Sequence, residues 1–584
     1  MNPGIRLVLR ILALSVSILA AGAQDRAPPG FGAPGPAKPF PDGSFEQGPA
    51  TWEFWQNAEG LGAFEISAHR PYAGKNCGKL SVKNTSSEIW HVQLVQRGFT
   101  VEKDRIYRFG YWARGENDAG MLEVAFVKGS PPWTFYSAAK QKVTSEWKRY
   151  EMSFTAPVTT TDIQVAFQCA SQRGDYYIDD IAFTAEGRME LKPLPADWYA
   201  RSEERIDSLR KGDFTLIAKA KGGRPCEGSA EIRLKRHEFP WGTCLNFQGG
   251  SFENRYRETA LRYFNSGVFE NAFKWEEFER VEGKPDIDDL ERYLKWSGQH
   301  DFPIRGHALV WGIEKYGFDK HWSRLKSDDF LRQSMRKRIE RDLSRYRGRI
   351  REYDVWNEPL HEPSLFNRLG PEILDSAFRW AHGADPGARL YINEYSIISG
   401  GDAKPYRDMV EAALKRGVPI HGIGVQGHFS GPIEPLDVAA KLYYMAELGL
   451  PLKVTEFDLD VKGLGLSEKR MAEEYVKILR TAFSHPAIEG FLFWGFWDAR
   501  HWRPGAGLFD DDLKPKAAAD SVYRLIHEVW TTSKTLKLDS LGRADFRGFF
   551  GSYDVATRCA DGTGRTLRAE FTKAGPRKAE AVSE

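Results

Sequence analysis

The pattern of apolar and polar positions changes character twice along the chain. From about residue 41 to 186, short runs alternate apolar and polar residues between turns, without helical periodicity. Regularly spaced short strands of this kind predict an all-β sandwich, here of the jelly-roll type. From about residue 201 to 530, helical and strand-like patterns take turns, and after residue 530 short alternating runs return. The pattern therefore predicts a β domain, an α/β domain and a second β segment.

The middle segment contains eight short apolar runs separated by helical stretches. Eight buried strands that alternate with helices predict a closed (β/α)8 barrel. The predicted strands lie within residues 239–246, 267–275, 302–311, 350–358, 389–396, 422–429, 451–459 and 490–498. Residues 327–348 illustrate the helical pattern: Ser327 is the expected N-cap and Gly348 the expected end. The apolar face is formed by Leu331, Met335, Ile339, Leu343 and Tyr346, and the Arg and Lys side chains are expected to be solvated.

The ends of the chain and the stretches between domains have compositions of their own. Arg6 and Arg10 precede an apolar run from Ile11 to Ala21, and small residues follow up to Ala23. This pattern predicts a signal peptide over residues 1–23. An uncleaved membrane anchor is the alternative, although the run is short for a membrane span. Residues 24–40 are a Pro/Gly-rich linker and residues 187–200 a second linker. Residues 531–584 are expected to form a β appendage and tail that packs on the barrel as a hairpin.

The amino-acid composition limits the classes of ligand that the chain is expected to bind. Lys and Arg number 82 and Asp and Glu number 80 among 584 residues, so no net charge attracts nucleic acid or anionic lipid. The chain is rich in aromatic rings, with Trp 18, Tyr 22 and Phe 36, which suits neutral ligands such as sugars. Five cysteines are scattered without metal-type spacing.

Export would permit disulfides among these cysteines, and an odd number leaves at least one thiol unpaired within the chain. Two pairs fall inside one predicted domain, Cys77 with Cys169 and Cys226 with Cys244. The sequence leaves the pairing open, and packed free thiols are the expected state for most of the five.

The first candidate catalytic residue stands at the end of the fourth predicted strand, in the stretch YDVWNEPLHEP at residues 353–363. Glu358 precedes a proline, which disfavours helix and predicts that this residue is still extended. The seventh predicted strand ends near Glu456 and Asp458. Two carboxyl groups at the carboxyl ends of barrel strands match the requirement for glycosidic bond cleavage. Taken alone, Glu358 is equally consistent with a surface acid.

Residues 200–530 resemble glycoside hydrolase family 10, the family of endo-β-1,4-xylanases. The resemblance is carried in order by ENAFKW, GHALVW, WNE, QGHF, TEFD and FWGFWDARHW. It implies a retaining double displacement in which Glu358 is the acid/base and Glu456 the nucleophile. Asn357 would bond the 2-hydroxyl of the sugar being cleaved, while His428 and Asp458 hold Glu456. The implied substrate-binding residues are Glu270, Asn271, Lys274, His307, Trp311, Asn357, Tyr395, Gln426, His428, Trp494 and Trp502.

Several positions depart from the pattern of that family. Trp356 and Pro359 replace the second Val and the Ala of DVVNEA, and Gly312 replaces a His. NDYN becomes NEYS, with Glu394 and Ser396. The acid/base and the nucleophile are unaffected, but the rim near the cleaved sugar is altered. NEYS and the terminal GSYDV are similar to the plant-like branch of the family.

The first β segment resembles the carbohydrate-binding modules of families 4, 9 and 22. The matching residues are DGSFE at 42–46, WHVQL at 90–94, YWARG at 111–115 and YYIDDI at 176–181. The resemblance also implies a structural Ca²⁺ near Glu46 and Asp180. No metal is expected in the barrel, and no other cofactor is expected.

Taken together, these features predict a secreted (extracellular or periplasmic) monomeric endo-β-1,4-xylanase that acts on plant cell-wall xylan. No nucleic acid and, after signal removal, no membrane is an expected partner. One alternative is a retaining glycanase for another β-linked polymer, such as β-glucan or a decorated xylan, because pocket width decides between xylose and glucose. The other is a non-catalytic polysaccharide-binding protein, which the two intact carboxylates disfavour.

Overall fold

The computed structural model describes residues 41–312 and 326–582, except positions 59, 132, 221, 248–249 and 576. The predicted signal peptide and first linker therefore lie outside the described residues. Within the described part of the chain, no helix has both the length and the apolar character needed to cross a membrane.

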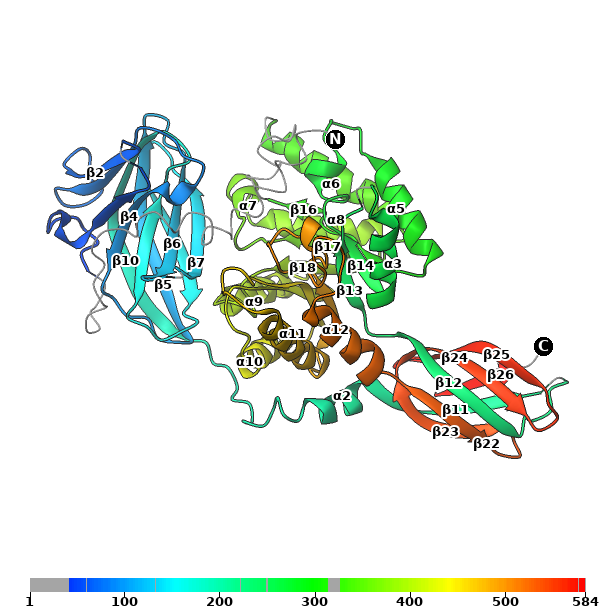
Figure 1. Ribbon diagram of the computed structural model, residues 1–584. Coiled ribbons are helices and arrows are strands. Elements are labelled where there is room, and N and C mark those ends of the chain that lie inside the picture. Colours follow the sequence, from blue (N-terminus) through cyan, green and yellow to red (C-terminus); the bar gives the residue numbers. More distant parts are fainter. Residues whose placement is uncertain are drawn as a thin grey trace. The chain divides into compact units, whose positions relative to one another are not determined.

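Residues 53–188 form a sandwich of two five-stranded antiparallel sheets, as the alternation predicts (Figure 1). One sheet has the order β1-β4-β9-β6-β7 and the other β2-β3-β10-β5-β8. The bounds are Glu53–Gln56 (β1), Gly62–Ser67 (β2), Cys77–Val82 (β3), Val92–Arg97 (β4), Arg105–Glu116 (β5), Met121–Lys128 (β6), Phe135–Lys142 (β7), Lys148–Thr155 (β8), Ile163–Gln168 (β9) and Gly174–Arg188 (β10).

The core of the sandwich is aromatic. Phe109 and Phe126 have ring centroids 5.3 Å apart, and Phe45 stacks on Trp52 at 5.0 Å. Trp52 and Tyr176 are buried, so these two rings serve packing. Trp90, in contrast, is partly exposed, and its ring stacks on the partly exposed ring of Trp55.

Nine strand segments of the middle region form one curled parallel sheet in the order β15-β14-β13-β21-β20-β19-β18-β17-β16. The third barrel strand is split into β15 and β16, and a parallel bridge between Gly306 and Tyr353 closes the ring. The segments are Trp241–Leu245 (β13), Ser266–Phe269 (β14), Ile304–Arg305 (β15), Val310–Trp311 (β16), Glu352–Asn357 (β17), Arg389–Glu394 (β18), Gly422–Phe429 (β19), Leu452–Leu459 (β20) and Ile488–Phe493 (β21). The predicted (β/α)8 barrel is confirmed.

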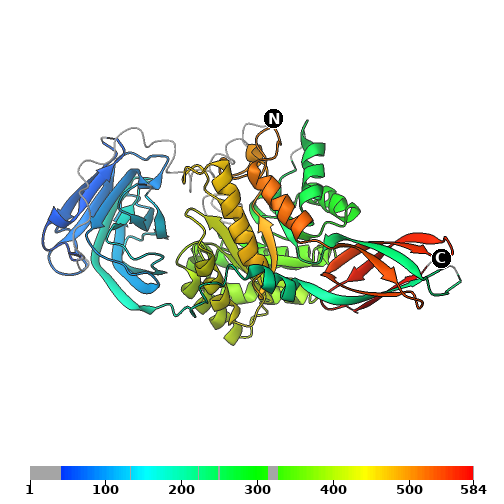
Figure 2. The ribbon, with the colours of Figure 1, turned by 60° about the horizontal axis from the view of Figure 1, so that its bottom comes forward.

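Helices alternate with the barrel strands and lie outside them (Figures 1 and 2). Their bounds are Ser202–Arg210 (α2), Glu253–Tyr263 (α3), Trp275–Phe278 (α4), Ile287–Gln299 (α5), Asp328–Tyr346 (α6), Ser364–Leu369 (α7), Glu372–Ala384 (α8), Ala403–Lys415 (α9), Pro435–Ala446 (α10), Glu468–Phe483 (α11) and Ala517–Tyr523 (α12), which a π-helical turn, Arg524–Val529, extends.

Helix α6 follows the prediction at its start and along its apolar face. The Ser327 hydroxyl accepts a hydrogen bond from the Phe330 N–H, and the five predicted apolar side chains are fully buried. The expectation that its basic side chains are all solvated is wrong for Arg338. Its guanidinium is buried and donates to the carbonyls of Phe273 (2.6 Å) and Ala308 (3.1 Å). Burial lowers the pKa of Arg338 to about 10.

The strands after the barrel form more than a single hairpin. They are Ser533–Leu538 (β22), Arg543–Phe549 (β23), Gly551–Cys559 (β24), Gly564–Phe571 (β25) and Lys578–Val582 (β26). Two strands that precede the barrel, Lys211–Lys219 (β11) and Gly228–His237 (β12), join them in two sheets, β23-β11-β26 and β22-β12-β24-β25. Strands β23 and β24 thus fall in different sheets. The prediction of a simple hairpin is wrong because β23 and β24 each pair with a strand from before the barrel, while β25 pairs with β24.

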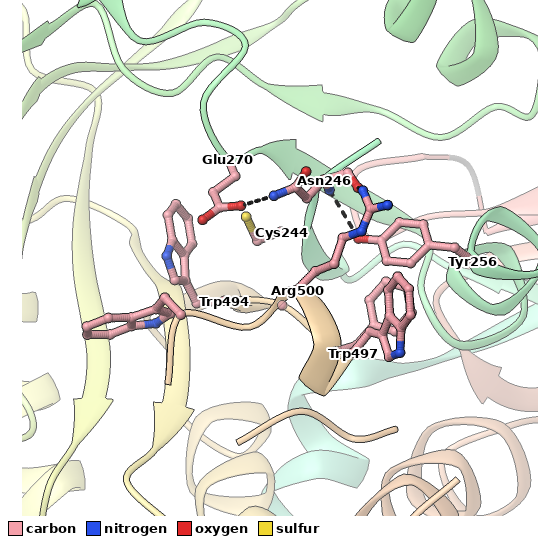
Figure 3. Close-up of a pocket in the computed structure, with 10 residues that line it drawn as sticks. Cys244, Asn246, Tyr256, Glu270, Trp494, Trp497 and Arg500 are labelled. Atoms are coloured by element: carbon pink, nitrogen blue, oxygen red, sulfur yellow. Dashed lines mark hydrogen bonds between the residues drawn. The ribbon is translucent and has the colours of Figure 1, made fainter. Parts of the chain in front are cut away.

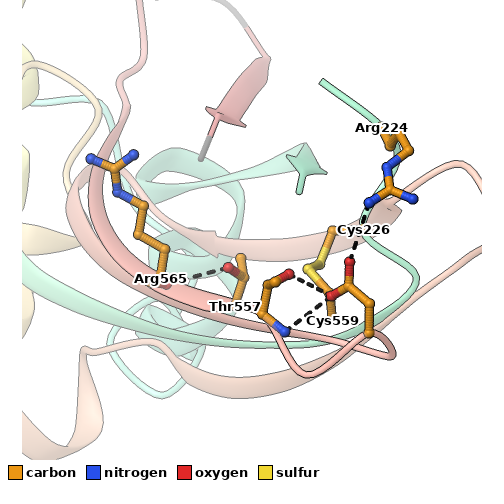
Figure 4. Close-up of a disulfide and its surroundings, with 7 residues drawn as sticks. Arg224, Cys226, Thr557, Cys559 and Arg565 are labelled. Carbon is orange, nitrogen blue, oxygen red and sulfur yellow. Dashed lines mark hydrogen bonds and ion pairs between the residues drawn. A yellow bond between two sulfur atoms is a disulfide. The ribbon is translucent and has the colours of Figure 1, made fainter. Parts of the chain in front are cut away.

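A disulfide links the two stretches of sequence, before and after the barrel, that form these two sheets. Cys226 bonds to Cys559 across 333 residues of sequence, while Cys77, Cys169 and Cys244 are buried free thiols (Figure 4). Neither pair that lies inside one predicted domain forms. Beside the disulfide, Arg224 lies 3.8 Å from the carboxylate of Asp561.

Candidate active site

Glu456 is the centre of a buried polar cluster in the barrel. It stands near the carboxyl end of β20 and is buried. Asn393, at the end of β18, donates from Nδ2 to Glu456 Oε1 at 2.7 Å. His428 Nε2, at the end of β19, lies 3.3 Å from Glu456 Oε2. Both carboxylate oxygens are therefore held by groups from neighbouring strands.

Thr455 fixes which way the Asn393 amide faces. Its hydroxyl donates to Asn393 Oδ1 at 2.6 Å, so the Nδ2 side of the amide points to the opposite neighbours. That nitrogen donates to Glu456 and also to Asn357 Oδ1 at 2.8 Å. Asn393 thus joins the ends of β17 and β20. It was not among the predicted site residues, although it stands at a predicted strand end like the others.

His428 connects Glu456 to a second carboxylate, as predicted. Its Nδ1 lies 3.0 Å from Asp458 Oδ1. Burial favours the neutral imidazole, but Asp458 and Glu456 outweigh it and raise the pKa of His428 to about 9. Asp458 also accepts from Trp502 Nε1 at 2.6 Å and lies 3.4 Å from Arg503. Burial alone would raise the pKa of Asp458, but the positive charges of His428 and Arg503 outweigh it and lower this pKa to about 2.

Glu358 follows directly after β17 and is buried. Its φ is 55°, in the left-handed region, so the expectation of extended backbone here is wrong. The Glu362 N–H donates to the Glu358 carbonyl at 2.9 Å, which shows that the chain turns at once. On the residue before it, Asn357 Oδ1 accepts from Asn393 and from Gln426 Nε2, the latter at 3.4 Å. The Asn357 amide nitrogen is thereby oriented away from these two donors.

A pocket lies where β13, β14 and β21 end, lined in part by Cys244, Asn246, Glu270, Trp494 and Arg500 (Figure 3). Asn246 Nδ2 donates to Glu270 Oε2 at 2.5 Å, and Arg500 donates to the Asn246 carbonyl at 3.1 Å. Burial raises the pKa of Glu270 above its usual value. Asn246, Cys244 and Arg500 were not predicted; Asn246 ends a predicted strand, whereas Arg500 lies in a loop that no periodicity marks.

Lys274 lies between two of the predicted tryptophans. Its buried ammonium is 4.6 Å from the ring centroid of Trp311 and 5.8 Å from that of Trp494. Its Nζ also donates to Asn271 Oδ1 at 3.2 Å. The predicted neighbours Asn271, Lys274, Trp311 and Trp494 are therefore brought together, and they present donors beside flat apolar rings.

His307 is fixed from inside the barrel. Its Nδ1 lies 2.9 Å from Asp354 Oδ2, and Arg305 forms two hydrogen bonds with the same carboxylate. Arg305 and His307 together outweigh burial and lower the pKa of Asp354 to about 2. The imidazole stands edge-on to Trp494, with centroids 5.1 Å apart. Asp354 therefore orients His307 towards the wall formed by Trp494.

Tyr395, also predicted, follows β18 and stacks on His361, with ring centroids 4.0 Å apart at 20°. His361 was not predicted, although it lies in the quoted stretch after Glu358. Among the residues that the structure describes, no three His, Cys, Asp or Glu side chains form a group that could hold a metal ion.

The comparison with protein families agrees with this geometry. Residues 233–525 match glycosyl hydrolase family 10, and residues 40–173 match a carbohydrate binding domain. The first match covers half of the chain, so the protein belongs to glycosyl hydrolase family 10, and it carries an N-terminal carbohydrate binding domain.

Similar proteins include "Endo-1,4-beta-xylanase 1" of Arabidopsis thaliana, 30% identical over 62% of this chain and 38% of that protein. "Anti-sigma-I factor RsgI6" of Acetivibrio thermocellus is 30% identical over 61% of this chain and 46% of that protein. The matched region thus spans less than half the length of either relative. Among solved structures, native xylanase 10B from Thermotoga maritima is 28% identical, with a TM-score of 0.46, and the match covers 50% of this chain and 96% of that one.

Proposed function

We propose that the protein is a secreted, retaining endo-β-1,4-xylanase. The observation that carries this proposal is the arrangement around Glu456, whose two oxygens are held by Asn393 and His428. A carboxylate held at both oxygens keeps a fixed direction of attack, as a nucleophile requires. Glu358 supplies the second carboxyl group from the end of β17, which lies three strands away from β20 in the barrel sheet. In a retaining enzyme the two carboxyl groups should lie about 5–5.5 Å apart.

The reaction proceeds in two displacements. In the first, Glu358 gives a proton to the glycosidic oxygen as the bond breaks, and Glu456 forms a covalent bond to the anomeric carbon. In the second, the ionised Glu358 takes a proton from water, which attacks the same carbon and releases Glu456. Asn357, whose Oδ1 already accepts two hydrogen bonds, donates from Nδ2 to the 2-hydroxyl of the sugar.

Xylan is the proposed substrate because one of the two similar proteins described above is named an endo-1,4-beta-xylanase. The flat rings of Trp311 and Trp494, with Lys274 between them, suit a neutral sugar with its apolar face on a ring and its hydroxyls towards donors. Another β-linked glycan remains the competing substrate, since xylose differs from glucose by the absence of a hydroxymethyl group.

The test compares initial rates of reducing-end release from purified xylan and from β-glucan, with the anomer of the first product followed by NMR. Faster release from xylan with retained configuration supports the proposal. Faster release from β-glucan would assign the other substrate, and an inverted product would overturn the mechanism. Binding of xylan without release of reducing ends would favour a non-catalytic polysaccharide-binding role.

The sandwich, by its family, is proposed to hold the enzyme on polysaccharide. The calcium site expected near Glu46 and Asp180 stays a prediction. Glu46 Oε1 accepts from the N–H groups of Lys75 (2.6 Å) and Asn76 (2.8 Å), and Oε2 accepts from the Asn76 amide (3.2 Å). These three hydrogen bonds fix the direction of the Glu46 carboxylate.

A further inference from the structure

A histidine held between two carboxylates lies inside the turn that follows Glu358. His361 Nδ1 is 2.9 Å from Glu394 Oε1, and Nε2 is 3.2 Å from Asp402 Oδ2. Both carboxylates are buried, and the imidazole side chain is 8% exposed. Because each ring nitrogen faces an acceptor, only the doubly protonated ring satisfies both contacts. Burial opposes this charge, but Glu394 and Asp402 outweigh it and raise the pKa of His361 well above its usual value.

Glu394 uses the rest of its carboxylate on backbone groups. Its Oε2 accepts from the Leu360 N–H at 2.8 Å, and Oε1 accepts from the Tyr395 N–H at 2.9 Å. Leu360 lies inside the turn that the Glu362 N–H closes onto the Glu358 carbonyl. The same carboxylate therefore holds both the turn behind Glu358 and the residue that carries the Tyr395 ring.

The turn needs such support. Glu358 is a non-glycine residue in the left-handed region and is followed by a proline, a strained backbone that persists only where the surroundings hold it. The hydrogen bond from Leu360 to Glu394 is one such restraint. The other is His361, which fixes Glu394 on one side, bridges to Asp402, and stacks on Tyr395 on its exposed side.

We propose that His361, bridging Glu394 and Asp402, is a positioning residue that holds the acid/base Glu358 and the ring of Tyr395 where the leaving sugar departs. The proposal rests on the hydrolase function proposed above and adds to it a group that touches neither substrate nor Glu456. The proposal also gives a role to Glu394, which stands where the family's NDYN motif has its Asp. Its effect falls on the step that needs a proton from Glu358, and not on attack by Glu456.

The experiment measures two rates for the wild type and for His361→Gln. One is kcat on xylan, whose leaving sugar needs a proton. The other is the first-turnover burst of phenolate from a dinitrophenyl xylobioside, whose leaving group needs none. We expect His361→Gln to lower the xylan rate by about 10–100-fold, because displaced catalytic groups lose rates of this order. The burst rate should change by less than about threefold, because Glu456 is undisturbed.

His485→Gln is the matched control, since His485 is also shielded from solvent but lies between α11 and β21, away from the site. It should leave the ratio of the two rates unchanged. Asp402→Asn keeps the hydrogen bonds of Glu394 to the backbone. It should shift the ratio of the xylan rate to the burst rate in the same direction as His361→Gln, but by less. This second variant tests the positioning role even if His361→Gln does not fold. Equal loss on both substrates in His361→Gln or Asp402→Asn would overturn the proposal. A wild type inactive on both would instead overturn the proposed function.

Discussion

At the scale of single residues, the direction of each polar group in the site depends on a neighbour one step away. Thr455 sets the Asn393 amide, and Asn393 then sets both Glu456 and Asn357. Glu358, Glu456 and His428 could be predicted because a strand-end rule and the quoted motifs point to them. Asn393 satisfies the same strand-end rule, but nothing in a one-dimensional pattern says that its side chain reaches two other strands.

Substitution of the two acids should separate their roles. Glu358→Gln should lower hydrolysis of xylan by about 10²–10⁴-fold, as loss of a general acid does, yet spare the first turnover of an activated aryl xylobioside. Glu456→Gln should abolish both, because no covalent intermediate can form. A 2-fluoro-xylobioside with a good leaving group, followed by peptide mapping, should place the label on Glu456. A label on Glu358 would reverse the assignment.

His428 should also make stability depend on pH. Its pKa is raised from 6.5 to about 9 in the folded protein, so its contribution is complete below pH 6.5 and is lost as pH rises through 9. A shift of this size corresponds to about 3 kcal/mol. Urea unfolding of the wild type and of His428→Gln should therefore differ most near pH 6 and converge near pH 9.5. A difference independent of pH would exclude this linkage.

At the scale of elements, apolar runs were sufficient to place every barrel strand, because a strand buried on both faces has a continuous apolar pattern. Helix α6 was equally predictable from its cap and its apolar face. Its buried arginine was not. Arg338 lies three residues after Met335 and seven after Leu331, at the edge of the apolar face, where a long side chain can still reach solvent. Only the packed barrel shows that its guanidinium donates to two backbone carbonyls. A charge pattern cannot distinguish a solvated arginine from one that bonds backbone.

Arg338→Met should therefore destabilise the barrel by about 2–4 kcal/mol, because it leaves two buried carbonyls without donors. Arg336→Met on the same helix is the control, since the Arg336 side chain is 58% exposed and pairs only with Glu340 one turn away. Exposed pairs of that kind contribute about 0.3–0.5 kcal/mol. Denaturant midpoints of the two variants should differ clearly; similar midpoints would mean that Arg338 is solvated.

At the scale of the whole molecule, the least predictable feature was the pairing of strands from the two ends of the catalytic region. Apolar and polar residues alternate along β11 and β12, as they do in edge strands. By distance along the sequence, the nearest candidate partner of each strand is the other one or the barrel. Their actual partners lie some 300 residues further on. Local patterns carry no information on such distant pairs, and the same reason hid the partner of Cys226.

Deletion of the sandwich, residues 41–186, should leave the rate of hydrolysis of soluble xylan oligosaccharides within about twofold of the wild type. The reason is that the proposed catalytic residues come from the barrel, and that a domain with its own core folds separately. Hydrolysis of insoluble xylan should fall, since binding to the solid raises the effective concentration of the substrate. Rates on both substrates are compared for the folded deletion variant. Loss of activity on the soluble oligosaccharides would show that the sandwich is part of the catalytic unit.

The bond between Cys226 and Cys559 also makes the catalytic region a covalent ring that contains all eight barrel strands. A single proteolytic cut in any barrel loop would open this ring without releasing a fragment. Limited digestion should therefore yield nicked material that migrates as one species without reductant and as two with it. The Cys226→Ser/Cys559→Ser variant should give two species under both conditions. An enzyme exported among proteases would in this way keep both halves of a cut barrel tethered to each other.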